Sequence, residues 1–145
     1  MRAVAQRVRS ARVSVAGEEV SRMGTGLLAL VGVAREDDAQ AAEELARRLV
    51  HLRVFPDAEG RMNRSLMDEN FGLLLVPQFT LAADTKKGTR ASFTKAAAPE
   101  KGQEYFKKLL DLCKKRLTTV ESGEFGANMQ VALINDGPVT FWLTS

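Results

Sequence analysis

The residues with the clearest chemical capacity follow an apolar run in the middle of the chain. The segment 73–76 is continuously apolar and of strand length, and Pro77 then removes a backbone N–H. Gln78, Phe79 and Thr80 come next and supply an amide, a ring and a hydroxyl. An amide and backbone N–H groups at the end of a buried strand can stabilise an oxyanion without any titrating group. The alternative is a strand that ends in an ordinary polar turn.

A basic, hydroxyl-rich segment follows at residues 82–98. It has no clear period, and its cations include Lys86, Lys87 and Arg90. Long loops without secondary structure in compact domains are mostly functional or disordered. We expect these three residues to contact phosphate groups, and a solvated insertion is the alternative.

Several familiar kinds of site are excluded by composition. His51 is the only histidine and Cys113 the only cysteine, so a zinc site of His and Cys ligands and a histidine-centred triad are not expected. Thr80 has no evident base to activate it as a nucleophile. There is no Walker-type loop, and residues 24–26 lack a dinucleotide fingerprint. The sequence therefore predicts no metal and no cofactor.

The first third of the chain predicts strands and then a helix. Residues 2–15 read as a strand whose apolar parity changes near residues 9–10, which requires a bulge. Turns at 16–19 and 24–26 and a buried strand at 27–34 predict an opening β-meander. A helix over 37–52 is capped by Asp37 and Asp38. Its apolar stripe is Ala41, Leu45, Leu49 and Leu52, and its ion pairs are Glu43–Arg47 and Glu44–Arg48.

The rest of the chain predicts a second helix and further strands. Pro99 suits the first position of a helix, and Cys113 lies on its apolar stripe as a buried small hydrophobe. Residues 57–60 predict a turn and 61–67 a short strand. Residues 129–134 and 141–143 predict two strands joined by a tight turn at 135–140.

Composition bounds the class of protein. A chain of 145 residues predicts a single domain, 1–145, and a net charge of +3 is a mild basic excess. One cysteine suits a reducing compartment, and the N-terminus has no apolar signal region. No apolar run reaches the ~18 residues of a membrane span, so we expect a cytoplasmic protein without membrane contact.

Two segments resemble the signature motifs of the D-aminoacyl-tRNA deacylases. They are 77–81, Pro-Gln-Phe-Thr-Leu, and 135–140, Asn-Asp-Gly-Pro-Val-Thr. The resemblance extends over the whole chain through residues 6–8, 57–63, 81–85 and 141–143. Either motif alone is a weak signal, but both in order, in a chain of this length, are a strong one.

The resemblance implies a fold, an activity and an assembly. The fold is α/β, with two main helices packed on curved, mostly antiparallel β-structure. The activity is hydrolysis of the ester between a D-amino acid, or glycine, and the terminal adenosine of tRNA, by a homodimer with active sites at the subunit interface. A cis Gly137-Pro138 step enters the partner's site, where its carbonyl oxygens exclude L-amino acids. Gln78, Phe79 and Thr80 line the pocket, and a ribose hydroxyl of the tRNA with a positioned water supports the reaction.

Two positions depart from the family pattern. Pro77 stands where the motif usually begins with Ser, which affects the fine specificity, including tolerance of L-alanine or glycine esters. Ala91 stands where many members have Pro. Three alternatives stay open: Thr80 as a nucleophile, a non-catalytic tRNA- or RNA-binding dimer that uses the basic loop and the lysine-rich face of the second helix, and a purely structural dimer.

Overall fold

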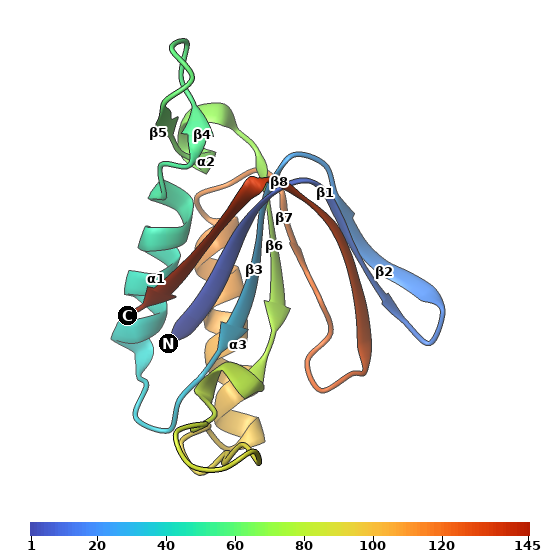
Figure 1. The fold of residues 1–145 in the computed structure, drawn as a ribbon, viewed down its shortest axis with the longest axis vertical. Helices are drawn as coiled ribbons and strands as arrows, with labels where there is room; N and C mark the ends of the chain where they lie inside the picture. The colour runs from blue at the N-terminus through green and yellow to red at the C-terminus, as the bar shows by residue number, and fades with distance from the viewer.

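The chain is built around one curved, six-stranded mixed sheet. The computed structural model describes residues 1–145. The strand order is β2-β1-β3-β6-β7, and β8 pairs with the other edge of β1 (Figure 1). A two-stranded hairpin, β4–β5, projects from one end. The strands are β1 Arg2–Val15, β2 Glu18–Met23, β3 Gly26–Gly32, β4 Phe55–Pro56, β5 Met62–Arg64, β6 Gly72–Pro77, β7 Val120–Ser122 and β8 Met129–Thr144.

The long first strand organises the sheet. Along one edge, residues 2–8 of β1 pair with β3 and residues 11–15 pair with β2. Along the other edge, residues 2–15 pair with β8. All three partners run antiparallel to β1. The bulge expected near residues 9–10 is confirmed, since the register against β8 shifts on either side of Val8. The predicted meander is wrong. At 14 residues, β1 is long enough to pair with both β2 and β3, so β3 does not follow β2 in the sheet.

The buried strands lie at the centre of the sheet. β6 is parallel to β3 and to β7, and residues 72–76 are buried, as a continuous apolar run predicts. Pro77 ends the strand, and the 3-10 turn η1 Phe79–Ala82 follows. The predicted end of this strand at Pro77 is therefore confirmed.

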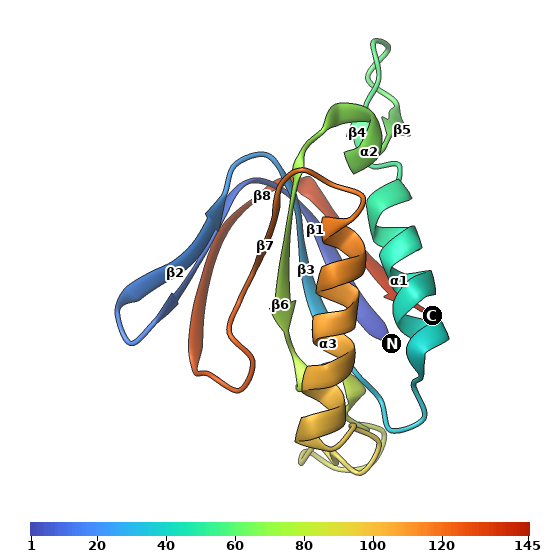
Figure 2. The same cartoon turned by 180° about the vertical axis from the view of Figure 1, so that it is seen from behind.

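Two long helices, α1 Ala39–His51 and α3 Pro99–Lys114, cover one face of the sheet (Figure 2). Asp38 caps α1 by accepting a hydrogen bond from the Ala41 N–H at 2.9 Å. Pro99 is the first residue of α3, as predicted. No helix has both the length and the apolar composition needed to cross a membrane.

Side chains of these helices are mostly placed as the periodicity predicts. Glu44 pairs with both Arg47 and Arg48, so the predicted Glu44–Arg48 pair is confirmed and the Glu43–Arg47 pair is wrong. Cys113 is buried, and its burial raises the pKa of the thiol to about 12. It therefore packs as a hydrophobe, not as a nucleophile.

Two predicted segments are corrected. Residues 61–67 form β5 and then the short helix α2 Leu66–Glu69, because Ser65 and Asp68 make a capping box. Residues 129–144 form one strand, not two strands and a tight turn. Both halves of β8 pair with the same strand, β1, and the extra residues bulge out opposite Arg7.

Candidate active site

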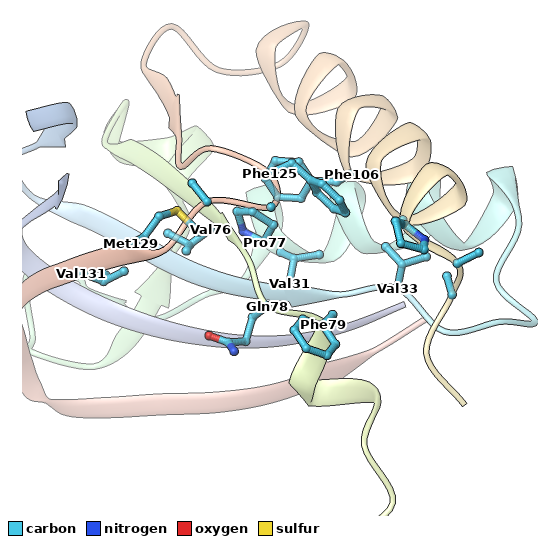
Figure 3. Close-up of a pocket in the computed structure, with 16 residues that line it drawn as sticks. Val31, Val33, Val76, Pro77, Gln78, Phe79, Phe106, Phe125, Met129 and Val131 are labelled. Carbon is cyan, nitrogen blue, oxygen red and sulfur yellow. The ribbon is translucent and has the colours of Figure 1, made fainter. Parts of the chain in front are cut away.

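An apolar cavity of about 470 Å³ opens where β3 and β6 end. The N-terminal turn of α3 and the loop between β7 and β8 close its other sides (Figure 3). Phe106 and Phe125 lie side by side at its back, with ring centroids 6.3 Å apart. A Cβ at Gly102 would lie 3.2 Å from the Phe125 ring, so the glycine in α3 makes room for this aromatic wall. The lining includes Val31, Val33, Val76, Pro77, Gln78, Phe79, Met129 and Val131.

The predicted site residues Gln78, Phe79 and Thr80 lie at the edge of this cavity. Gln78 and Phe79 line it, and the Gln78 amide points away from the two phenylalanine rings (Figure 3). The Gln78 Nε2 donates to the Thr80 Oγ1 at 2.5 Å. The N–H groups of Phe79 and Thr80 begin the 3-10 turn, so neither has an acceptor within the turn itself. N–H groups at the start of such a turn can donate to a bound oxygen atom.

The turn is fixed to the sheet from two sides. The Gln78 N–H donates to the Val31 carbonyl at 2.7 Å, and the Arg2 Nη1 donates to the Leu81 carbonyl at 3.1 Å. The site therefore rests on β3 and β1, which are rigid elements.

Asp84 orders the basic loop after the turn through both its backbone and its carboxylate. Asp84 and Ser92 pair through two backbone hydrogen bonds of 2.8 and 2.9 Å. The Lys86 N–H and the Lys95 ammonium hold the pKa of Asp84 below its usual value. Lys86, Lys87 and Arg90 are exposed, and none forms an ion pair. These cations are free to meet an anionic partner.

The second signature segment is clamped by polar side chains. The Asn135 Oδ1 accepts from the Val139 N–H at 2.8 Å, and its Nδ2 donates to the Thr140 Oγ1 at 3.0 Å. The Arg7 Nε donates to the Asp136 carbonyl at 2.9 Å, and its Nη1 donates to the Val54 carbonyl at 2.6 Å. Gly137 and Pro138, held between these anchors, are exposed, and their peptide bond is cis.

One chain does not bring the two signature segments together. Gly137 and Pro138 lie opposite Arg7, which is in register with Leu27 and, through it, with Leu73 at the start of β6. Gln78 lies five residues further along that strand direction, or roughly 16 Å, and three strands away. Figure 1 shows the kink of β8 at the opposite end of the sheet from the turn after β6.

Several site residues were not identified from the sequence. Phe125 and Met129 line the cavity, and Phe106, placed on the apolar stripe of α3, also reaches it. Gly102, an isolated glycine inside a predicted helix, is a signal of close packing that could have indicated this place. No group of three or more His, Cys, Asp or Glu side chains is placed to hold a metal ion.

Comparison with known proteins defines the class. A family model described as D-Tyr-tRNA(Tyr) deacylase matches residues 4–144. The chain therefore belongs to this deacylase family, and the resemblance drawn from the two motifs is confirmed.

Individual relatives agree over nearly the full length. A D-aminoacyl-tRNA deacylase of Alkalilimnicola ehrlichii is 62% identical over 138 residues, which are 95% of this chain and 92% of the relative. One of Azotobacter vinelandii is 56% identical over 143 residues, 99% of each chain.

Solved structures share the fold, so the predicted α/β class is confirmed. The structure of a c-Myc DNA Unwinding Element Binding Protein superposes with a TM-score of 0.96 at 38% identity and covers 100% of this chain and 99% of that one. A probable eukaryotic D-amino acid tRNA deacylase gives a TM-score of 0.85 at 18% identity, covering 98% and 97%.

Proposed function

We propose that this chain is a D-aminoacyl-tRNA deacylase, which hydrolyses the ester between a D-amino acid, or glycine, and the terminal adenosine of tRNA. The family assignment and the names of full-length relatives support the reaction class. We also propose a cytoplasmic enzyme that needs no cofactor and proofreads charged tRNA.

The observation that carries this proposal is an aromatic cavity beside the two N–H groups that begin the 3-10 turn. A cavity of about 470 Å³ walled by Phe106 and Phe125 suits a nucleobase, which buries its faces against apolar side chains. An ester carbonyl at its edge would meet the N–H groups of Phe79 and Thr80. Donors placed in this way stabilise the negative charge that develops as water attacks the ester. With no histidine here, we assign the proton transfers to a ribose hydroxyl of the tRNA and a positioned water.

The open face of the sheet supports a homodimer. Trp142, Val4, Leu30 and Val76 are paired directly across β8, β1, β3 and β6. Their side chains therefore project from the face that the helices leave uncovered. Trp142 is 55% exposed on this face. Val4 and Leu30 beside it are half-buried, and Val76 at the end of the row is buried within the chain. A large exposed aromatic ring next to half-buried apolar side chains is typical of a protein–protein interface.

In this dimer the exposed Gly137-Pro138 step of one subunit enters the other subunit's site. Its main-chain carbonyl oxygens would occupy the space that an L-amino acid side chain needs, so that only a D-amino acid or glycine fits. The polar anchors around the step, Asn135 and Arg7, support this role because they fix it without covering it. The Gly137-Pro138 segment and residues 78–80 lie far apart within one chain, which also supports a site completed by the partner subunit.

The direct test is deacylation of D-Tyr-tRNA and L-Tyr-tRNA by the purified protein. We expect hydrolysis of the D-ester with the L-ester spared. Salt-sensitive tRNA binding without turnover would support the non-catalytic alternative, to which the name of the DNA-binding structural relative lends some weight. L-Ala-tRNA belongs in the same assay, because Pro77 replaces the usual Ser of the motif.

Removing the Thr80 hydroxyl is expected to have a small effect. The Thr80 Oγ1 accepts from the Gln78 amide, which cannot take a proton from it, so the hydroxyl has no base. We expect Thr80→Ala to keep kcat/KM for D-Tyr-tRNA within about tenfold of wild type, whereas loss of a nucleophile costs on the order of 10³-fold or more. A larger loss in the folded variant, with tRNA binding unchanged, would restore the threonine mechanism.

The unpaired cations of the basic loop are expected to set the salt dependence of tRNA binding. Replacing Lys86, Lys87 and Arg90 together by Gln should flatten the plot of log K against log salt by ~0.7–0.9 for each phosphate that the loop no longer binds. The control replaces Lys114, Lys115 and Arg116, which are also unpaired but lie at the C-terminal end of α3, a helix ~24 Å long whose N-terminal end borders the cavity. An equal change of slope in both variants would refute a specific role for the loop.

A further inference from the structure

Two aromatic rings lie exposed at the mouth of the cavity. Phe79 and Phe93 are in contact, with ring centroids 5.1 Å apart and planes inclined by 54°. They are 58% and 43% exposed. Phe79 lines the cavity and Phe93 does not, so the pair continues the aromatic surface outward from the cavity.

Phe93 is held in this position by its neighbours. On one side, Ser92 pairs with Asp84 through two backbone hydrogen bonds. On the other side, the Ala96 N–H donates to the Phe93 carbonyl at 3.0 Å, and the Ala97 N–H donates to the Val33 carbonyl at 3.0 Å. The exposed ring therefore sits on a fixed segment beside the end of β3.

The surroundings of the pair are those of a single-stranded nucleic acid site. Lys86, Lys87 and Arg90 lie in the same loop and form no ion pair. Exposed aromatic rings next to unpaired cations bind single strands, because bases stack on the rings while the cations meet the phosphates.

We propose that Phe93, together with the outer part of the Phe79 ring, is the stacking platform for the nucleobase that precedes the terminal adenosine of tRNA. This inference rests on the proposed function. With the terminal adenosine in the cavity, the preceding nucleotide leaves across the mouth, where the Phe79–Phe93 pair and the cations lie. Phe93 thereby contributes to the recognition of a polynucleotide and not to the recognition of the ester.

The test compares substrates with and without that base. The variants are Phe93→Ala and Phe93→Trp, and the D-tyrosyl esters are those of tRNA, of tRNA with an abasic penultimate nucleotide, and of free adenosine. For the tRNA ester we expect Phe93→Ala to raise KM by about tenfold and Phe93→Trp to retain wild-type KM, since stacking tolerates either ring. For the adenosine ester all three proteins should be alike. The abasic tRNA should remove the difference between wild type and Phe93→Ala.

Other outcomes overturn either the platform or the function, and they can be told apart. An equal loss on tRNA and adenosine esters would make Phe93 a support of the cavity and refute the platform. Loss of dimer mass in Phe93→Ala, measured by sedimentation, would assign the pair to the subunit interface and also refute it. If wild type hydrolyses no D-ester, the proposed function fails. In that case the stacking platform is still tested, by comparing the Kd values of wild type and Phe93→Ala for uncharged intact tRNA and for uncharged abasic tRNA.

Discussion

Gly137→Ala is expected to lower kcat/KM for D-Tyr-tRNA by about 100-fold or more and to reduce the preference for the D-ester. Gly137 has φ +146°, and an added Cβ would lie 2.6 Å from Val139 Cγ2 and 2.9 Å from the Val139 nitrogen. The segment must move, and a displacement of ~1 Å at a reacting centre costs on the order of 10²-fold. The measurement is single-turnover deacylation of D- and L-Tyr-tRNA.

The control for this prediction is Gly60→Ala. Gly60 also has a positive φ, +80°, but a Cβ there meets nothing within 4 Å, and it lies in the β4–β5 turn. It carries similar backbone strain without touching the proposed chirality filter, so we expect some loss of thermal stability and unchanged selectivity. If Gly137→Ala behaves like Gly60→Ala, the role assigned to the Gly-Pro step is wrong.

Two inactive variants are expected to restore activity when they share a dimer. Ala98→Trp would fill the mouth of the cavity from an exposed position. Gly137→Ala would displace the Gly-Pro segment that enters the partner subunit's site. A heterodimer of the two has one site built entirely from unmodified parts. Isolated through two different affinity tags, it should show about half of the wild-type activity, as expected for a site shared between two-fold related subunits.

The homodimers of each variant provide the comparison for this experiment. Both are expected to be nearly inactive, because every site in them contains one altered part. If each site were contained within one chain, the heterodimer of Ala98→Trp and Gly137→Ala would have no intact site and no activity. That result would remove the shared-site proposal while leaving the deacylase assignment in place.

Features set by local sequence were predictable. The apolar run that ends at Pro77, the N-cap at Asp38, and the first helical position of Pro99 each depend on a few adjacent residues. The bulge in β1 was predictable for a related reason, since the change of apolar parity near residues 9–10 shows where the strand must shift its faces.

Features set by pairing between distant parts of the chain could not be predicted from the sequence. The sequence of β3 does not state whether β1 or β2 lies beside it, because both offer free edges to an apolar strand. The segment 135–140 contains the usual signals of a tight turn, and only its pairing with β1 on both sides keeps it within one strand. Likewise, Phe125 reaches the cavity because a glycine 23 positions earlier leaves room for its ring.

Arg7 links two parts of the molecule that are far apart in sequence. One guanidinium holds both the Asp136 carbonyl beside the Gly-Pro step and the Val54 carbonyl at the base of the β4–β5 hairpin. During evolution, the tip of that hairpin should accept insertions and deletions freely, because the tip lies beyond this link. The residues at its base should instead change together with those of the Gly-Pro segment, so that a substitution in one is accompanied by a compensating substitution in the other.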